Sequence, residues 1–231
     1  MKKIEEEFSK NAHSYREYSS IQKKVVQALL ENITTKPKRI LEMGSGTGEV
    51  FTQSNWQIEQ FTATDISKKM CEVHPKGKHV TIKEISFDSE YFFTALNEHK
   101  YDFLISSSAL HWSEDLDALF KQVSATKLPF AFSLFTSGTF LSFLSNLEVT
   151  SYLKSKEELI QLFEKHFVGS YNVEQYTLSF TSARALLQYI KKTGVSINKE
   201  KVSVGKLKNW IDSKPSLELE FEVLFFYSDN R

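Results

Sequence analysis

Three glycines spaced two residues apart follow a short apolar run near the start of the chain. Gly44, Gly46 and Gly48 come directly after residues 39–43, which read Arg-Ile-Leu-Glu-Met. Glycine lets the backbone turn sharply and, having no side chain, lets a ligand approach the main chain closely. In the dinucleotide fingerprint the third glycine falls three residues after the second, whereas here it falls only two after. The spacing therefore indicates a ligand loop at the end of a strand and argues against a pyrophosphate site.

An acidic residue lies where a nucleoside could use it. Asp65 ends the next apolar run and comes 21 residues after Gly44. A carboxylate at this place can accept hydrogen bonds from both hydroxyls of a ribose. A glycine loop alone could be a purely structural turn, but the loop, its strand context and Asp65 together favour a ligand that contains a nucleoside.

Short apolar runs alternate with helical patterns around this loop. Such alternation predicts a parallel sheet with helices on both faces. The predicted strands are residues 39–43, 61–65, 79–85, 101–106 and 128–135, and the predicted helices begin near residues 47 and 67 or span 92–97 and 116–123. In open sheets of this kind ligands bind beyond the carboxyl ends of the strands, which is where the glycines and Asp65 fall.

The two ends of the chain are expected to add to this sheet. Ser155 and Glu158 have capping-box spacing ahead of an apolar helical pattern. Residues 217–227 alternate apolar and acidic side chains, which predicts an antiparallel strand near a sheet edge. Further predicted elements are a helical segment 1–33, a strand 173–180, a helix 182–193 ended by Gly194 and a weaker helix 204–211. We expect a single domain with an N-terminal helical cap (1–36), a ligand-binding core (37–136) and C-terminal strands with a helical substrate-side insertion (137–231).

Composition narrows the class of protein. The 231 residues carry 29 lysines and arginines against 29 aspartates and glutamates, so no net field draws nucleic acid or a membrane to the whole surface. A single cysteine, Cys71, excludes an internal disulfide. Apolar runs are strand-sized, and the six histidines lack the spacing of metal ligands. We therefore expect a cytoplasmic protein without a bound metal, nucleic acid or membrane anchor, and the oligomeric state stays open.

The sequence from 39 to 135 resembles the class I methyltransferases that use S-adenosylmethionine. Residues 41–48 read as the first motif of that class, 63–67 as the second, and 101–112 resemble its fourth-strand motif. The resemblance implies a Rossmann-like fold with a seven-stranded, mostly parallel sheet, an antiparallel last strand, N-terminal helices and a small helical cap. It also implies S-adenosylmethionine as cofactor, bound by Glu42, Gly44, Ser45, Gly46, Gly48, Asp65, Ile66, Met70, Asp88, Ser106 and Ser107.

Regions outside these motifs are similar to the malonyl-acyl-carrier-protein O-methyltransferases of biotin synthesis. The resemblance is carried by residues 8–18 and 21–24, by 108–112, by 135–140, by 186–195 and by the closing strand 219–226. It implies methyl transfer to the free carboxylate of a malonyl group on an acyl carrier protein, an acidic partner. Two departures are Thr126-Lys127-Leu128-Pro129, where the family often has a Pro-Lys-Gly turn, and Lys191 in place of a common arginine. Lysine keeps the charge but loses the planar fork that grips a carboxylate in two places.

The acceptor side of the site is assigned from the same resemblance. Tyr15 and Tyr18 are the candidate catalytic residues, one of whose hydroxyls would orient the malonyl carboxylate. The candidate residues for binding the substrate or the carrier are His111, Trp112, Arg184, Lys191 and Lys192. Each has a plainer alternative. The tyrosines could be a core stripe of the first helix, His111 and Trp112 could pack a helix start, Asp88 could cap a loop, and the charges could be a solvated face.

Two other functions compete with this interpretation. A methyltransferase for a small carboxylic acid, or for another small molecule, would share the cofactor motifs and lack dependence on a carrier. A non-catalytic S-adenosylmethionine-binding protein could be built on the same fold, because fold does not establish function.

Overall fold

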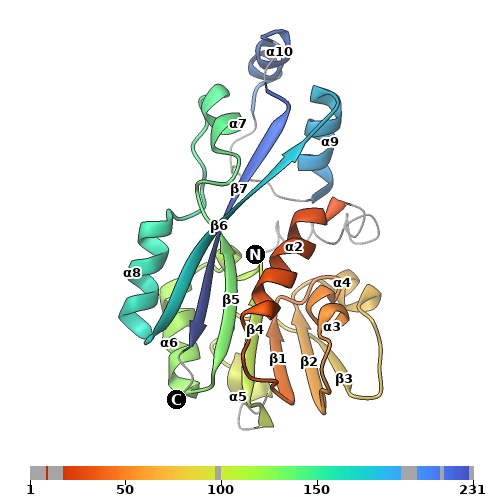
Figure 1. The fold of residues 1–231 in the computed structure, drawn as a ribbon, viewed down its shortest axis with the longest axis vertical. Helices are drawn as coiled ribbons and strands as arrows, with labels where there is room; N and C mark the ends of the chain where they lie inside the picture. The colour runs from red at the N-terminus through yellow and green to blue at the C-terminus, as the bar shows by residue number, and fades with distance from the viewer. Residues whose placement is uncertain (1–8, 10–17, 97–99, 194–201, 214–215, 229–231) are drawn as a thin grey trace.

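A computed structural model describes residues 9, 18–96, 100–193, 202–213 and 216–228, and its centre is one seven-stranded sheet (Figure 1). The strands are β1 (Arg39–Met43), β2 (Gln60–Asp65), β3 (Val80–Glu84), β4 (Phe103–Ser107), β5 (Phe130–Phe135), β6 (Gly169–Ser179) and β7 (Glu218–Ser228). Their spatial order is β3-β2-β1-β4-β5-β7-β6. The first five strands pair in parallel, whereas β7 runs antiparallel to both β5 and β6. The predicted mostly parallel sheet with an antiparallel last strand is thus confirmed.

Alternate side chains of the strands bury two separate hydrophobic cores, one on each face of the sheet. Phe132 of β5 and Phe226 of β7 belong to one core, and their neighbours Ala131 and Phe225 belong to the other. Because successive side chains of a strand point to opposite faces, both faces must be covered by helices. At about 25 cal/mol per Å² of apolar surface, burial on both faces is the main favourable term that holds the sheet and helices together.

The helices divide between the two faces. Leu29 of α2 (Ser20–Glu31) and Val50 of α3 (Glu49–Gln53) pack into one core. The opposite core takes apolar residues from α5 (Phe92–Leu96), α6 (Leu116–Thr126) and α8 (Lys156–His166). Helix α4 (Lys68–Val73) follows β2, and a short 3-10 helix, η2 (Leu110–Trp112), follows β4. Within the described part of the chain, no helix is long and apolar enough to cross a bilayer.

The strands β6 and β7 form a long ribbon that extends past the rest of the sheet. They pair along their full lengths, from Gly169 opposite Ser228 to Ser179 opposite Glu218, whereas β5 pairs only with residues 223–227 of β7. The free half of the ribbon carries α7 (Leu141–Asn146), α9 (Ala183–Thr193) and α10 (Val204–Asp212), which lie together at the upper end of the molecule in Figure 1.

Most predicted elements are confirmed, and the exceptions have local causes. The capping box of α8 forms as expected, with Ser155 N donating to the Glu158 carboxylate at 2.7 Å and Glu158 N donating to Ser155 Oγ at 3.2 Å. Strand β6 begins at Gly169, four residues before its predicted start, because it is an edge strand whose mostly exposed side chains give little alternation. Helix α7 was not predicted. The segment 1–17, apart from Ser9, and Gly194 lie outside the described residues.

Candidate functional site

The glycine loop adopts backbone angles that favour glycine at all three positions. The φ angles of Gly44, Gly46 and Gly48 are +73°, +51° and +80°. A Cβ atom on Gly44 would lie 2.3 Å from the Cβ of Ala109, so the close packing of Ala109 also requires glycine at this position. A Cβ atom on Gly46 would meet nothing within 4 Å. The middle of the loop therefore faces open space, into which a ligand can come close to the main chain.

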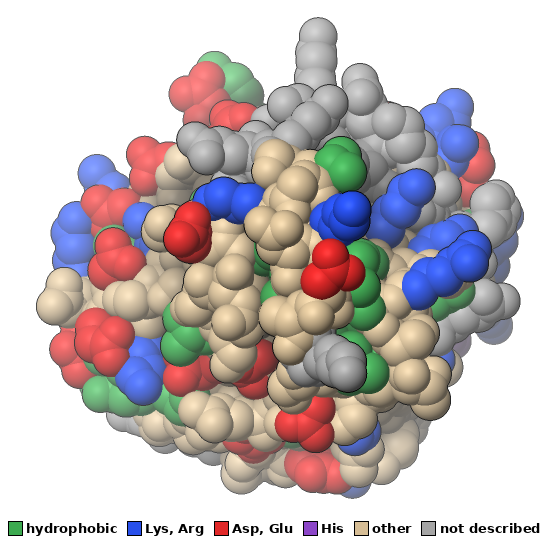
Figure 2. All heavy atoms as spheres, turned by 90° about the horizontal axis from the view of Figure 1, so that it is seen from above, with side chains coloured by type: hydrophobic (Ala, Val, Ile, Leu, Met, Phe, Trp, Pro, Cys, Tyr) green, Lys and Arg blue, Asp and Glu red, His purple; other side chains and the backbone are tan. Residues whose placement is uncertain are grey.

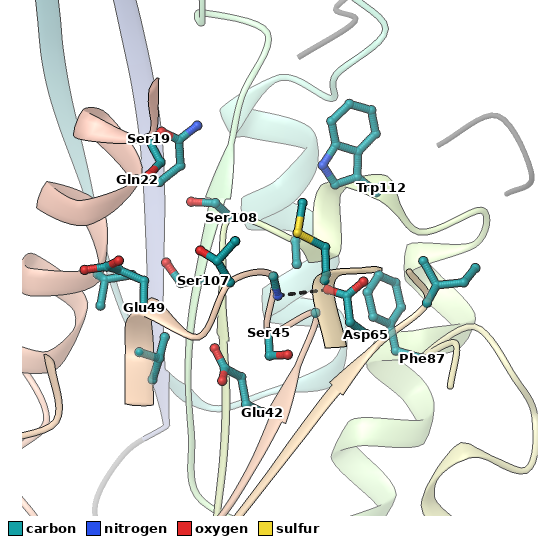
Figure 3. A pocket seen from close by; sticks show the side chains of 18 of the residues that line it. Ser19, Gln22, Glu42, Ser45, Glu49, Asp65, Phe87, Ser107, Ser108 and Trp112 are labelled. Atoms are coloured by element: carbon teal, nitrogen blue, oxygen red, sulfur yellow. Dashed lines mark hydrogen bonds between the residues drawn. The ribbon is translucent and has the colours of Figure 1, made fainter. Parts of the chain in front are cut away.

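Asp65 ties this loop to the carboxyl end of β2. Its carboxylate accepts hydrogen bonds from Gly46 N and from Ser67 N, both at 2.8 Å, and the first is the dashed line in Figure 3. Burial raises the pKa of Asp65 to about 6, although the backbone hydrogen bonds from Ser67 and Gly46 oppose that shift. The carboxylate is therefore ionised at neutral pH and keeps lone pairs for further hydrogen-bond donors.

A cavity opens beside the loop, with about 960 Å³ of space including its opening to solvent. Nine residues predicted from the sequence line it: Glu42, Gly44, Ser45, Gly46, Asp65, Ile66, Met70, Ser107 and Trp112. The structure thus brings residues from β1, β2, β4, α4 and η2 to one place, although the chain separates them by as many as 70 positions (Glu42 to Trp112).

Three of the predicted cofactor residues do not line the cavity and instead support it. Ser106 is buried, and its hydroxyl donates to Met43 O at 2.6 Å. The carboxylate of Asp88 accepts hydrogen bonds from the Ser113 hydroxyl and from Glu114 N, which is the loop-capping alternative weighed above. A Cβ atom on Gly48 would lie 2.5 Å from Pro75 Cδ, so this glycine serves the packing of the loop against the end of α4.

The predicted acceptor residues are dispersed rather than gathered. Trp112 lines the cavity, and the ring of His111 lies behind it, 5.2 Å from the Trp112 ring and 5.5 Å from that of Phe135. Burial lowers the pKa of His111 to about 3, so its ring is neutral at physiological pH. Tyr18 packs against the core beside α2 and accepts a hydrogen bond from Gln188 Nε2 at 3.4 Å, while Tyr15 lies outside the described residues.

The basic residues of α9 stand apart from the cavity. Arg184 lies in the first turn of the helix, and Lys191 and Lys192 lie in the last. Arg184 and Lys191 are exposed and Lys192 is half-buried, and none of the three lines the cavity. Any role for them therefore concerns a surface partner.

Sequence reasoning missed several residues that line the cavity: Ser19, Gln22, Val26, Thr47, Glu49, Val50, Ser86, Phe87, Ser108 and Ala109. Two of these had a recognisable signal. Gln22 is a polar residue on the otherwise apolar buried face of α2. The sequence signal of Ser108 is that it extends the polar run Ser106-Ser107 at the end of β4. The structure adds that its φ is +56°, which is uncommon for a residue other than glycine. Backbone outliers of this kind cluster at functional sites.

Four buried polar atoms on the cavity wall lack a hydrogen-bond partner among the described residues. They are Gln22 Oε1, Glu42 Oε2, Ser45 Oγ and Ser108 Oγ. Leaving such an atom unpaired costs on the order of 1–3 kcal/mol, so their gathering around one cavity indicates a polar ligand. Burial, and then the nearby charge of Asp65, raise the pKa of Glu42 well above its usual range.

The charged side chains that line the cavity are all acidic among the described residues. They are Glu42, Glu49 and Asp65. This arrangement favours a ligand that carries positive charge and offers hydroxyl groups, since carboxylates accept hydrogen bonds and attract cations.

Comparisons with known proteins agree with this geometry. Residues 41–131 match a family described as a methyltransferase domain. A malonyl-[acyl-carrier protein] O-methyltransferase of Chlorobium luteolum is 25% identical and covers 93% of this chain and 87% of its own. One from Bacillus anthracis is 28% identical, over 85% of this chain and 81% of its own.

Solved structures share the fold. The YcgJ protein of Bacillus subtilis superposes with a TM-score of 0.62 at 14% identity, over 90% of this chain and 99% of its own. Phosphoethanolamine N-methyltransferase 2 of Haemonchus contortus, solved with S-adenosylhomocysteine, gives a TM-score of 0.58 at 16% identity, over 96% of this chain and 58% of its own.

The cavity has the properties that S-adenosylmethionine requires. The cofactor carries an adenine, a ribose with two hydroxyls, a sulfonium and an ammonium group. Phe87, Ile66 and Met70 offer apolar surface suited to the adenine, and Asp65 offers a carboxylate suited to the ribose. Glu42, buried with an unpaired oxygen, offers an acceptor for a cationic group. From the methyltransferase motifs, the sheet topology and this cavity, we conclude that the chain is a class I S-adenosylmethionine-dependent methyltransferase with a Rossmann-like fold.

Proposed function

We propose that this enzyme transfers a methyl group from S-adenosylmethionine to the free carboxylate of malonyl-acyl carrier protein. The observation that carries the proposal is the similarity to enzymes of that name, at 25–28% identity over 85–93% of this chain. The product would be the methyl ester of malonyl-acyl carrier protein, which serves pimelate and biotin synthesis. The reaction would take place in the cytoplasm.

Methyl transfer to a carboxylate requires the protein mainly to position the acceptor against the cofactor. A carboxylate oxygen of the acceptor attacks the methyl carbon that the cofactor presents, the new C–O bond forms as the S–C bond breaks, and the electron pair stays on sulfur. No proton moves, because a carboxylate is already ionised near pH 7. A general base is therefore unnecessary, and the protein contributes orientation and exclusion of water.

Two features of this chain suit that task. Helix α2 lies over one side of the cavity and supplies Ser19, Gln22 and Val26 to its wall. Trp112 lies at the opposite side of the opening (Figure 3). The hydroxyl of Tyr15 or Tyr18 would help to orient the malonyl carboxylate. The Tyr18 ring packs against the core and its hydroxyl accepts a hydrogen bond from Gln188 of α9, whereas Tyr15 lies outside the described residues.

Docking of an acidic carrier protein requires a local basic surface on this enzyme, because the enzyme as a whole has no net charge. Figure 2 looks onto the end of the molecule that carries α10 and shows lysine and arginine side chains in a band across that face. We assign docking of the acidic carrier to the basic residues of α9, which are Arg184, Lys191 and Lys192. Electrostatic complementarity of this kind mainly raises the association rate and weakens with added salt.

Comparing acceptors under identical conditions tests the proposed function. Purified enzyme is given labelled S-adenosylmethionine with malonyl-acyl carrier protein, malonyl-coenzyme A or free malonate, and incorporated label is measured over time. We expect the carrier-bound substrate to be used best, and the gene to restore growth without biotin to a strain that lacks this step. Better use of free malonate or another small acid would favour a small-molecule enzyme. Cofactor binding without transfer to any malonyl acceptor would reject the assignment and favour a non-catalytic role.

A further inference from the structure

Two of the unpaired polar groups lie toward the opening of the cavity, away from its floor. In Figure 3, Glu42 and Ser45 lie at the bottom of the cavity, whereas Gln22 lies near the top with Ser19 and Trp112, and Ser108 lies between these levels on the side of α2. The floor belongs to the cofactor loop and β1. The upper polar groups therefore face the space through which a second substrate must approach.

Ser108 is held rigidly in a conformation that presents its hydroxyl to the cavity. Its backbone N–H donates to Ser133 O at 2.9 Å and approaches Ser133 Oγ at 3.2 Å, which fixes the main chain at the end of β4. Its φ of +56° costs energy for a residue with a side chain. The hydroxyl is nevertheless buried without a partner among the described residues. A strained residue whose hydroxyl is buried without a partner among the described residues is suited to binding a ligand.

Gln22 lies on the α2 side of the cavity, and α2 is held in place by a hydrogen bond to α3. Its side chain is 7% exposed, and Oε1 has no hydrogen-bond partner among the described residues. The neighbouring turn of α2 is fixed to α3, since Gln53 Nε2 donates to Lys23 O at 3.1 Å and to Glu49 Oε1 at 2.9 Å. The side-chain amide can rotate by half a turn to present either its oxygen or its nitrogen.

We propose that Gln22 and Ser108 are positioning residues of the acceptor subsite and, together with the tyrosine hydroxyl, hold the acceptor's carboxylate by neutral hydrogen bonds. This inference rests on the proposed function, in which the acceptor is a carboxylate. The charged residues that line the described wall are acids, so the donors to a carboxylate there are neutral groups, and the Ser108 hydroxyl and the Gln22 amide are two of them near the opening. Both donors can bind one carboxylate oxygen and leave the other free to attack the methyl carbon. Neutral donors also leave more electron density on the attacking oxygen than a paired cation would.

The test isolates the contact with the carboxylate from docking of the carrier. Malonyl-acyl carrier protein is compared with acetyl-acyl carrier protein, which lacks only the carboxylate, by calorimetric binding to enzyme saturated with S-adenosylhomocysteine. For each variant the ratio of the two dissociation constants is measured. We expect Gln22→Met and Ser108→Gly each to reduce the preference for the malonyl carrier about tenfold, because each removes one hydrogen bond to a charged group. Glycine tolerates the positive φ at residue 108, so this variant should fold.

Two further variants sharpen the result. Gln22→Glu has nearly the same shape as the wild type and places a like charge opposite the substrate, so it should abolish the preference for the malonyl carrier while acetyl-carrier binding is kept. Ser45→Ala removes another unpaired hydroxyl of the same cavity, but from the cofactor loop. This variant should weaken binding of S-adenosylhomocysteine and leave the preference for the malonyl carrier unchanged.

The outcomes separate this inference from the proposed function. If the Gln22 and Ser108 variants bind S-adenosylhomocysteine within twofold of wild type and keep the full preference for the malonyl carrier, the inference is overturned and the proposed function stands. If they weaken cofactor binding as much as acceptor binding, the two residues belong to the cofactor site and the inference is overturned as well. If the wild-type enzyme shows no preference for the malonyl carrier and no methyl transfer to it, both fail.

Discussion

The two ends of the cavity are built in different ways. The cofactor end is made by one compact stretch, in which the loop after β1 is hydrogen-bonded to the end of β2 through Asp65. The opening is made by Gln22 on α2 together with Ser108 after β4 and Trp112 on η2, which follow Gln22 by 86 and 90 positions in the chain. The first depends on backbone geometry and the second on side chains brought together by packing. This difference explains why the cofactor is identified with less ambiguity than the acceptor.

The largest expected effect comes from Gly44, because both the packing of the loop and the cofactor site require glycine at this position. A Gly44→Ala variant places a Cβ atom 2.3 Å from that of Ala109 at a φ of +73°. Overpacking and backbone strain together should lower the free energy of unfolding by about 3 kcal/mol. Urea denaturation measures the loss, and calorimetry should detect no cofactor binding. A variant with wild-type stability would show that the loop is free to shift away from β4.

The next effect is a pH dependence of cofactor affinity governed by Asp65. Its pKa of about 6 in the free protein means that the carboxylate becomes protonated as pH falls through 6. Protonation removes an acceptor for the ribose and an attraction for the cationic groups, so affinity should fall about tenfold per pH unit below 6 and level off above it. Calorimetric titrations of wild type and Asp65→Asn test this, since the variant should bind weakly with little pH dependence in that range. A flat wild-type profile would mean that Asp65 does not contact the cofactor.

Gly46 should separate binding from folding within the same loop. A Gly46→Ala methyl group meets no protein atom within 4 Å, so its structural cost is limited to strain at a φ of +51°, about 1 kcal/mol. The methyl group would occupy space next to the ligand and weaken cofactor binding about tenfold. Gly44→Ala should therefore lose both stability and cofactor binding, whereas Gly46→Ala should lose cofactor affinity with little loss of stability. An equal loss of stability in the two variants would contradict the assignment of open space over Gly46.

The smallest effect is expected on the surface of α9. Replacing Arg184, Lys191 and Lys192 together by alanine should raise the KM for malonyl-acyl carrier protein several-fold at low salt and much less at high salt. The KM for malonyl-coenzyme A serves as the control and should stay close to that of the wild type, because these side chains do not line the cavity. An equal rise for both substrates would place these residues in the substrate site instead of the docking surface.

Sequence patterns predicted the parts of the molecule that depend on local geometry. The bounds of β1 were predicted as observed, Asp65 is the last residue of β2 as expected, and the three glycines follow the end of β1 as expected. These signals are short-range, since a buried strand is continuously apolar and a sharp turn needs glycine. The direction of β7 was also predicted, because its alternation is typical of antiparallel pairing with one exposed face.

Residues whose role depends on the packing of distant elements were harder to predict. Gln22 reaches the cavity only because α2 lies across the end of the sheet. Ser108 turns inward because of its positive φ angle, which cannot be predicted from the sequence. Conversely, Ser106 was predicted to contact the cofactor, but alternation along β4 directs its side chain to Met43 O. The cofactor half of the site was thus accessible from motifs, whereas the opening required three-dimensional information.

The fate of the transferred methyl group tests the central claim most directly. Enzyme, labelled S-adenosylmethionine and malonyl-acyl carrier protein are incubated, the carrier is isolated, and it is then treated with mild base. Methyl transfer to a carboxylate gives an ester, so the account predicts that the label is on the carrier and that base releases it as volatile methanol. Label that stays bound after base treatment, or a carrier that never acquires label, would contradict a carboxylate acceptor on the carrier.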